Sequence, residues 1–324
     1  MKSALIFALI AFAIALVIAP FLLKFLRKLK AGQQVLHYVE LHKQKSGTPT
    51  MGGIIFILPM IILAGFVINR DTPLALIAVL ASMGYALVGF LDDFIKIKFK
   101  KNQGLRAYQK IIAQGGIAIL VSIFYFMANL DGRILIPFLN TYWDIGWVIL
   151  PLTFIVLIAT TNSVNLTDGL DGLAGMVSLI YLIFISFLIA LTANFMNLAE
   201  SNTFIALAAI TCGGLVCFLI FNTNKAKVFM GDTGSLYLGS IIATLSMFSF
   251  LGFYILILGV MFVVSAVSDI VQVAYFKKTG GKRVFLMAPF HHHLEMRGWS
   301  EAKIVFLYCA VTVVAGTACV IFLV

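Results

Sequence analysis

Charge is what this 324-residue sequence lacks most. Charged residues make up 11% of the chain, against roughly 25% in soluble domains, and 62% of the residues are hydrophobic. So few ionised groups exclude an ordinary water-soluble globular protein, and the mean hydropathy of +1.07 agrees with that. The long apolar stretches predict an integral protein of the lipid bilayer.

Cysteine and acidic residues are also scarce. Cys212, Cys217, Cys309 and Cys319 all lie in apolar stretches without a Cys-x-x-Cys spacing, which favours small buried side chains over disulfides or a metal site. Asp and Glu number 13, against 23 Lys and Arg. In a membrane protein this excess marks cytoplasmic loops, so we expect no nucleic acid as a partner.

The apolar stretches predict an all-α fold. Each is long enough to cross, or nearly cross, the hydrocarbon core of a bilayer. They lie near residues 3–23, 53–69, 74–91, 111–128, 145–161, 173–191, 203–221, 235–250, 252–273 and 304–323. We expect a polytopic membrane protein of about ten transmembrane helices. Because no repeat or low-complexity tract sets a part of the chain aside, residues 1–324 are predicted to form a single transmembrane domain.

The basic residues predict the orientation of the helices. With both termini outside, all 23 Lys and Arg residues except Lys2, Arg70 and Arg133 fall on the cytoplasmic side. The strongest positive cluster follows the first stretch, which indicates an uncleaved helix and not a signal peptide. On the outer side, residues 129–146 predict a small hairpin or interfacial loop with Trp143 as an aromatic anchor.

Five polar segments gather at the predicted cytoplasmic ends of the helices. Polar groups are costly in lipid, so such a cluster is the usual sign of a functional site. The segments are KSGTPTMGG (45–53), FLDDFIKIK (90–98), NSVNLTDGLDGLAG (162–175), FNTNKAKVFMGDTGS (221–235) and MAPFHHHLEMRGWSE (287–301). We therefore expect an active site on the cytoplasmic face.

Asp92 and Asp93 are predicted to end an apolar helix. Adjacent carboxylates repel each other unless a cation or a shared proton offsets the charge, so a divalent metal is one explanation. Two solvated acids that end a helix beside Lys96 and Lys98 are an equal alternative.

Asn162, Asn165, Asp168 and Asp171 recur every three residues. On a helical turn they would form a polar strip of amide and carboxylate oxygens, which suits a hard cation or sugar hydroxyls. A turn built from Asx and Gly residues is the alternative. The position directly after a membrane helix favours function.

The run from Gly231 to Ser235 leads into another apolar helix. Its small residues and helix-start amides would let a phosphate approach closely while Asp232 reaches a metal. The run lacks the Gly-Lys-Ser/Thr ending of a P-loop, and Thr233 or Ser235 as a helix N-cap is the alternative.

His291, His292 and His293 are consecutive and cannot share one helix face, whereas on an extended loop His291 and His293 would pair. Zinc is a poor fit, because its ligands are usually separated in sequence, but imidazoles beside Arg297 suit phosphate. Solvated histidines on an interfacial loop are the alternative.

Lys45 and Thr50 are candidate anion donors, with a helix-start turn as an equal alternative. The predicted site thus combines acids with groups that bind anions, yet the acids alone would repel a phosphate. Magnesium resolves this conflict, because one or two carboxylates and substrate phosphates hold it together.

The runs SGTPTMGG, LDDFIKI, NLTDGLDGLAG, VFMGDTGSLYLG and MAPFHHHLE, in this order, resemble the polyprenyl-phosphate N-acetylhexosamine-1-phosphate transferases over nearly the whole chain. The resemblance implies an enzyme of the bacterial inner membrane that requires Mg²⁺. It would transfer phospho-N-acetylmuramoyl-pentapeptide from UDP-MurNAc-pentapeptide to undecaprenyl phosphate, which yields UMP and lipid I for peptidoglycan synthesis. A homodimer is compatible with the resemblance, although no dimer motif is present.

The resemblance also implies roles for individual residues. Asp232 would bind magnesium, while Asp92 and Asp93 would orient or deprotonate the lipid phosphate or assist the metal, with Asp92 as the base. His291 would be a further catalytic group that stabilises phosphates. The substrate-binding residues would be Lys45, Thr50, Lys110, Asn162, Asn165, Asp168, Asp171, His292 and His293.

Several alternatives stay open. Transfer of N-acetylglucosamine-1-phosphate would use the same aspartate motifs, and the PFHHHLE and SGTPTMGG segments favour the muramoyl substrate. A carboxylate that first forms a phospho-enzyme is not distinguished from direct attack. A transporter would place polar groups near the bilayer midplane, which this sequence does not. A structural scaffold would leave the loop acids and histidines unexplained.

Overall fold

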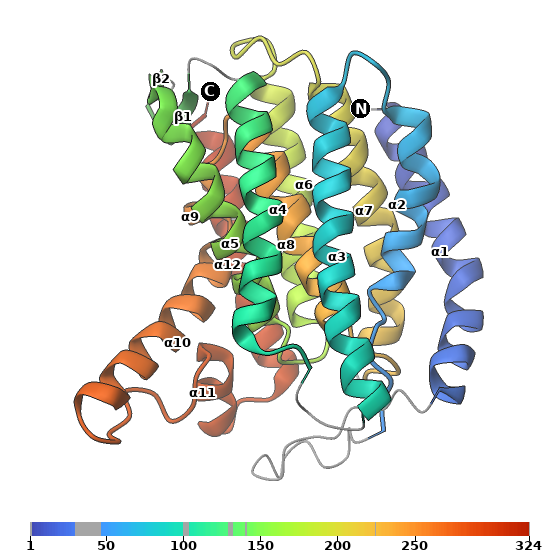
Figure 1. The fold of residues 1–324 in the computed structure, drawn as a ribbon, viewed down its shortest axis with the longest axis vertical. Helices are drawn as coiled ribbons and strands as arrows, with labels where there is room; N and C mark the ends of the chain where they lie inside the picture. The colour runs from blue at the N-terminus through green and yellow to red at the C-terminus, as the bar shows by residue number, and fades with distance from the viewer. Residues whose placement is uncertain are drawn as a thin grey trace.

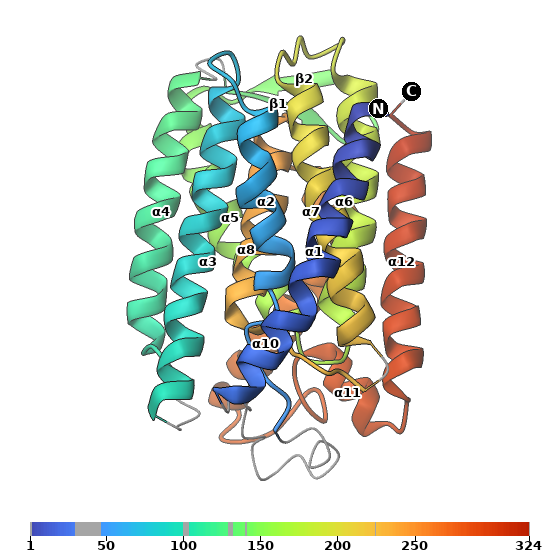
Figure 2. The same ribbon diagram turned by 90° about the vertical axis from the view of Figure 1, so that its right-hand side faces the viewer.

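The protein is a bundle of α-helices that run mostly side by side (Figure 1, Figure 2). This computed structural model describes residues 2–29, 47–99, 104–128, 132–139, 141–223 and 225–323. The helices are α1 (Lys2–Lys28), α2 (Ile54–Val67), α3 (Pro73–Phe99), α4 (Ala107–Ala128), α5 (Ile149–Thr167), α6 (Leu173–Thr192), α7 (Ser201–Asn222), α8 (Gly231–Phe248), α9 (Tyr254–Leu258), α10 (Val260–Lys278), α11 (Phe290–Met296) and α12 (Glu301–Ile321). Two short strands, β1 (Arg133–Ile136) and β2 (Thr141–Asp144), and a 3₁₀ turn (Gly146–Val148) precede α5.

The length and composition of the helices confirm an all-α polytopic membrane protein. Within the described residues, eight helices are long and apolar enough to cross a bilayer: α1, α3, α4, α5 with its 3₁₀ turn, α6, α7, α10 and α12. The apolar helix α2 has 14 residues and α8 has 18. The start of α1 and the end of α12 lie at the same end of the bundle (Figure 1, Figure 2), as an even number of crossings requires. Ten crossings stay a prediction.

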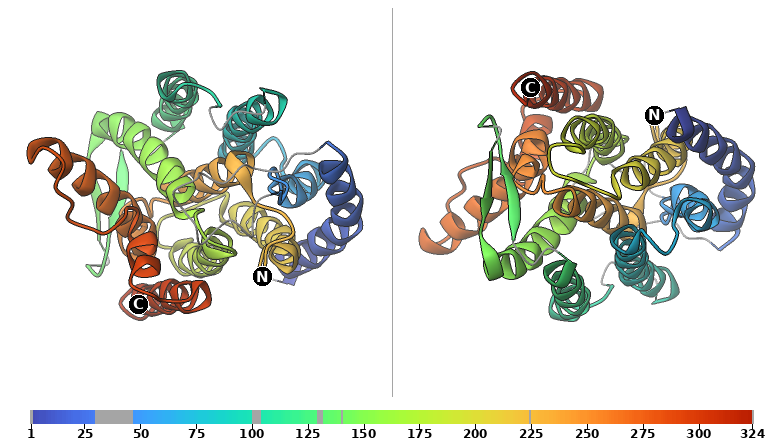
Figure 3. Two further views of the ribbon diagram at one scale, coloured as in Figure 1. Left: turned by 90° about the horizontal axis from the view of Figure 1, so that it is seen from below. Right: turned by 90° about the horizontal axis from the view of Figure 1, so that it is seen from above.

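Helix α8 is the centre of the bundle, and it lies among α3, α5, α6 and α7 (Figure 3). Every residue from Thr233 to Phe248 is buried. Its hydroxyl groups bond back to its own carbonyls, as Thr244 Oγ1 does to Ser240 O at 2.8 Å. Because neighbouring helices screen α8 from lipid, a helix with this many Gly, Ser and Thr residues is tolerated.

Glycines allow the helices around α8 to approach its backbone. A Cβ atom on Gly89 of α3 would clash with the backbone of Asp232, and one on Gly239 of α8 would clash with the backbone of Thr161 in α5. In lipid, the hydrophobic effect does not drive helices together, so their association depends on close van der Waals packing. Small residues at the contacts make that close packing possible. The position of α3 and α5 against α8 therefore depends on residues that have no side chain.

The start of α3 is capped from another part of the chain. Glu200, which is buried just before α7, accepts hydrogen bonds from Leu74 N at 3.1 Å and Ala75 N at 2.7 Å. These amides have no partner inside the helix, and a carboxylate suits the positive end of the helix dipole. The contact fixes α3 at the end opposite to its aspartates.

Three sequence expectations can be compared with the observed elements. The hairpin is confirmed, since β1 and β2 are antiparallel with Ile134 opposite Trp143. The expected end of a helix at Asp92 and Asp93 is wrong, because α3 continues to Phe99 and carries the Asp92–Lys96 ion pair one turn further. The ninth apolar stretch is divided at Gly259 into α9 and α10, and α10 leaves the bundle (Figure 1).

We predict that Gly239→Ala destabilises the protein, because its Cβ meets the backbone of α5, and overpacking of this kind costs roughly 1–3 kcal/mol. The matched control is Gly116→Ala in α4, where a Cβ has nothing within 4 Å. Thermal unfolding in detergent should show a lower apparent Tm for the first variant and an unchanged or higher one for the second. Equal Tm values for both variants would contradict the close α5–α8 contact.

Candidate active site

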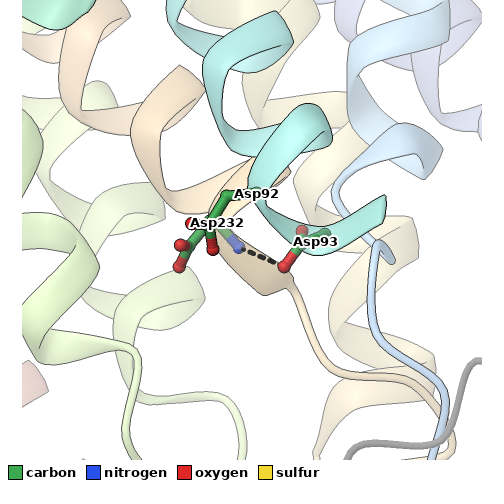
Figure 4. Close-up of side chains that lie close together, drawn as sticks. All are labelled: Asp92, Asp93 and Asp232. Atoms are coloured by element: carbon green, nitrogen blue, oxygen red, sulfur yellow. Dashed lines mark hydrogen bonds between the residues drawn. The ribbon is translucent and has the colours of Figure 1, made fainter. Parts of the chain in front are cut away.

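Three aspartates meet at the end of the bundle where α3 approaches its last turns and α8 begins (Figure 4). Asp92 and Asp93 come from α3, and Asp232 comes from the first turn of α8. One carboxylate oxygen from each lies within 4.8 Å of the others, and the group is a candidate for holding a metal ion. The close approach at Gly89 is what brings the two helices together at this point.

Asp93 points at the start of α8 and not at its neighbour Asp92. It is buried, and its carboxylate accepts hydrogen bonds from Thr233 N at 3.0 Å and Thr233 Oγ1 at 2.7 Å. It also accepts a hydrogen bond from Asp232 N at 3.3 Å (Figure 4). The carboxylate therefore satisfies backbone donors that a helix start leaves without a partner. Asp93 holds the first turn of α8, and with it Asp232, in place.

Asp92 and Asp232 are balanced by two lysines. Lys96 Nζ pairs with Asp92 and lies 3.3 Å from Asp232 Oδ2, and Lys110 Nζ lies 2.8 Å from the same oxygen. Asp92 Oδ1 also accepts a hydrogen bond from Leu105 N at 2.8 Å. The weakest sequence-based candidate, Lys110, thus lies directly at the acidic cluster.

The predicted strip of Asn and Asp residues divides between two places. Asn165 Nδ2 donates to Asp232 Oδ1 at 2.7 Å and to Ser235 Oγ at 2.8 Å, so Asn165 belongs to the acidic cluster. Asn162 Nδ2 instead donates to Gln114 Oε1 at 2.7 Å in α4. Asp171 lies in the turn after α5 and accepts from Ala226 N at 2.9 Å.

Asp168, at the end of α5, faces the other acids. Burial, together with the charges of Asp232, Asp93 and Asp171, raises the pKa of Asp168 to about 8. A carboxylate near like charges is disfavoured unless a cation lies close by. This part of the site therefore has more negative charge than its surroundings balance.

The histidines lie on a helix, α11, so the pairing of His291 with His293 that an extended loop would give does not occur. Successive residues on a helix point about 100° apart, so the three rings separate. His291 is buried, and its Nε2 lies so close to Gly169 that a Cβ there would clash. His292 Nδ1 lies 3.0 Å from Glu295 Oε2, and His293 Nδ1 accepts from Leu286 N at 3.1 Å.

His291 is the histidine that stands nearest to the acidic turn. Neither of its ring nitrogens has a hydrogen-bond partner among the described residues. Burial, together with the nearby His292, lowers the pKa of His291 to about 3. The imidazole is therefore neutral near pH 7, with one nitrogen as donor and the other as acceptor for a ligand.

The segment 47–53 packs along the chain that leads into α8. Gly52 N donates to Phe229 O at 2.8 Å, and Gly53 N donates to Met230 O at 3.0 Å. Thr50 is buried, and a Cβ on Gly231 would lie 2.5 Å from its Oγ1. Thr50 therefore stands beside the acidic cluster, whereas Lys45 lies outside the described residues.

Sequence reasoning missed several side chains of the site. From the sequence, Lys96 was expected only as a residue beside Asp92 and Asp93 in the alternative in which these two acids are solvated. Its i, i+4 spacing from Asp92 is nevertheless a signal for an ion pair. Thr233 and Ser235 were expected at most as helix caps, and they instead bind Asp93 and Asn165. Gln114 is buried in an apolar helix. The one feature of the sequence that could have marked it is that a polar side chain in a membrane-spanning helix is energetically costly.

The donors of the cluster fit a hard divalent cation. Carboxylate oxygens are the ligands that such a cation takes, and two lysines next to three aspartates show that the cluster attracts positive charge. No thiol or unpaired imidazole points into the three-aspartate group among the described residues. A zinc-type site is therefore a poor match here.

Comparisons with known proteins agree with this arrangement. Residues 75–250 match the family described as glycosyl transferase family 4, and residues 45–57 match a signature of phospho-N-acetylmuramoyl-pentapeptide-transferases. A protein of that name from Caldanaerobacter subterraneus is 41% identical over 97% of both chains. Those from Clostridium kluyveri and Shouchella clausii are 42% and 43% identical, over 94% of this chain and 95% and 93% of theirs. The chain therefore belongs to glycosyl transferase family 4, among the phospho-N-acetylmuramoyl-pentapeptide-transferases.

Proposed function

We propose that this protein transfers phospho-N-acetylmuramoyl-pentapeptide from UDP-MurNAc-pentapeptide to undecaprenyl phosphate, with UMP and lipid I as products. The observation that carries this proposal is the cluster of Asp92, Asp93 and Asp232 at the basic, cytoplasmic end of a membrane bundle. The names of the similar proteins support the muramoyl substrate. The protein would act as a single catalytic domain in the bacterial inner membrane.

The cofactor we propose is Mg²⁺, held by Asp232 and Asp92. When bound there, it would neutralise charge on the substrate phosphates. Asn165 holds one oxygen of Asp232 by a 2.7 Å hydrogen bond and leaves the other toward Lys96 and Lys110. The ammonium groups would then turn to phosphate oxygens, for which Lys is a common partner.

The lipid phosphate is the proposed nucleophile. One of its oxygens would form a bond to the β-phosphorus of the UDP-sugar while the bond from that phosphorus to the bridging oxygen breaks, and UMP leaves with the electron pair. The second pKa of a phosphate monoester is near 6, so little deprotonation is needed at pH 7. Asp92 would accept the remaining proton and orient the phosphate.

The geometry supports a positioning role for Asp93. Both of its oxygens are occupied by donors of the α8 start, so it would act through Asp232. The alternative, in which a carboxylate first forms a phospho-enzyme, would require Asp93 to give up these contacts, or Asp92 to give up its contacts with Leu105 N and Lys96.

The nucleotide-sugar would lie between the turn 168–171 and α11. His291 presents a neutral, unsatisfied imidazole there, and Asp168 and His292 stand close by. Asn162, Asp171 and His293 have protein partners and would contribute to the shape of the pocket around the substrate. Thr50 and Lys45 would donate hydrogen bonds to the phosphates of the substrates. N-acetylglucosamine-1-phosphate transfer is the second candidate function, because the aspartates would serve it equally.

We expect the purified protein to release UMP from UDP-MurNAc-pentapeptide and undecaprenyl phosphate only when Mg²⁺ is present. Asp232→Ala should lower the rate at least about 100-fold, as loss of a central electrostatic group does. Asp144→Asn, at the opposite end of the bundle, is the control and should keep full activity. Release only from UDP-N-acetylglucosamine would overturn the substrate, and release from neither donor would overturn the transferase.

Lys110→Met should lower kcat roughly 10–1000-fold, because it removes a charge 2.8 Å from Asp232 Oδ2. Lys98→Met, an exposed lysine on α3, is the matched control for loss of one charge. The measurement is steady-state UMP release with both substrates varied. Equal rates for the two variants would exclude Lys110 from the site.

Mg²⁺ should stabilise the protein more at pH 8 than at pH 5. The raised pKa of Asp168 means that the folded protein loses stability as pH rises from about 4 through 8, since this carboxylate becomes charged near other acids. A bound cation offsets that loss. Apparent Tm with and without Mg²⁺ tests this, and Asp232→Asn should remove the difference. A shift that is the same at both pH values would contradict a cation at the acidic cluster.

A further inference from the structure

A pocket separate from the acidic cluster lies at the cytoplasmic end of the bundle, between the last turns of α1 and the segment that follows α7. Its volume is about 460 Å³. Its lining residues are Pro20, Leu23, Lys24, Arg27, Phe221 and Lys227. None of these residues belongs to the candidate active site. Three cations and three apolar side chains thus share one pocket at the level where a helix leaves the membrane.

The cations of this pocket form no ion pair with any carboxylate in the part of the chain that the structure describes. Lys24, Arg27 and Lys227 are exposed, and no ion pair joins any of them to an acid among the described residues. The acids at this end of the bundle are engaged elsewhere: Asp171, for example, accepts from Ala226 N. The pocket is therefore a site of positive charge open to an anion.

The packing of α1 explains why the pocket exists. Over its outer part, α1 lies close to α7 through small buried residues, Ala11, Ala15 and Ala19 among them, and a Cβ on Gly213 of α7 would clash with Ala8 O. Beyond Pro20 the buried residues become larger, starting with Leu23. Helix α1 crosses α7 obliquely (Figure 2). The pocket is lined by the last turns of α1, by Phe221 near the end of α7 and by Lys227.

The neighbouring surface of α1 is apolar and suits contact with acyl chains. Phe21 and Phe25 are 73% and 57% exposed, on the same turns as Lys24 and Arg27. Apolar side chains exposed on a membrane-spanning helix face lipid, while Lys and Arg at its end reach the headgroup region. A ligand of this pocket therefore meets apolar surface toward the bilayer and positive charge toward the cytoplasm.

We propose that this pocket binds the phosphate headgroup of an anionic phospholipid from the cytoplasmic leaflet. Basic pockets between transmembrane helices on the cytoplasmic side suit such headgroups. Arg27 would bind two phosphate oxygens through its planar guanidinium, and Lys24 and Lys227 would add point charges. The acyl chains would lie along the exposed phenylalanines of α1.

The occupied pocket would also steady the candidate active site. Lys227 lies in the segment between α7 and α8, where its N donates to Phe221 O at 2.7 Å. On either side of Lys227, Ala226 N donates to Asp171, and Phe229 O accepts a hydrogen bond from Gly52 N in the loop 47–53. Asp232 follows Lys227 by five positions. A lipid that fixes Lys227 therefore restrains the segment that leads to the proposed metal ligand.

The test measures lipid binding by the full chain without turnover, so it is independent of the proposed reaction. Delipidated protein in neutral detergent is titrated with phosphatidylglycerol or phosphatidylcholine and observed by native mass spectrometry. The variant Lys24→Gln/Arg27→Gln/Lys227→Gln should bind phosphatidylglycerol on the order of 100-fold more weakly than the original protein. Lys227→Arg should retain binding, which shows that charge in the pocket is what matters.

The matched control is Lys2→Gln/Lys28→Gln/Lys225→Gln, which loses the same charge at exposed residues that do not line the pocket. It should bind phosphatidylglycerol as the original protein does. An equal loss in both triple variants, or equal binding of the two lipids, would overturn the proposal. Displacement of the lipid by millimolar glycerol phosphate as effectively as by phosphatidylglycerol would assign the pocket to a soluble phosphate and overturn it as well. Unchanged apparent Tm of the variants confirms that they are folded.

Discussion

The structure of the active end depends on one set of hydrogen bonds, those from the first turn of α8 to the carboxylate of Asp93. The donors are Thr233 N, Thr233 Oγ1 and Asp232 N. The helix start has amides without partners, and burial makes such amides costly. By satisfying them from α3, Asp93 joins two helices that are about 140 residues apart in sequence. Asp232 owes its position to this contact.

The close approach at Gly89 makes these hydrogen bonds possible. A Cβ there would clash with the carbonyl group of Asp232, so the two helices would separate and the carboxylate would no longer reach Thr233. The same principle acts along the rest of α8, where Gly239 contacts α5. A central helix of small residues thus gives close packing, and close packing gives the acidic cluster its geometry.

Charge balance explains the remaining features of the cluster. The three carboxylates, two of them buried, repel one another, and Lys96 and Lys110 compensate part of that repulsion. The raised pKa of Asp168 indicates that the compensation is incomplete. A cluster with this excess of negative charge is suited to a divalent cation. The basic pocket beside α1, which lies outside this cluster, has an excess of positive charge instead.

The sequence by itself determined the membrane class, the helical fold, the hairpin and the five segments that make the site. These follow from composition, from the length of apolar stretches and from the cost of polar groups in lipid, all of which are local properties of the chain. Only the tertiary structure decided which partner each polar residue has. Residues that are close in sequence have different partners. Asp93 binds the start of α8, and Asn162 binds Gln114 in α4. The three consecutive histidines lie on different sides of α11. The physical reason is that these partners lie on other helices, and their approach is set by glycine contacts that a local pattern does not contain.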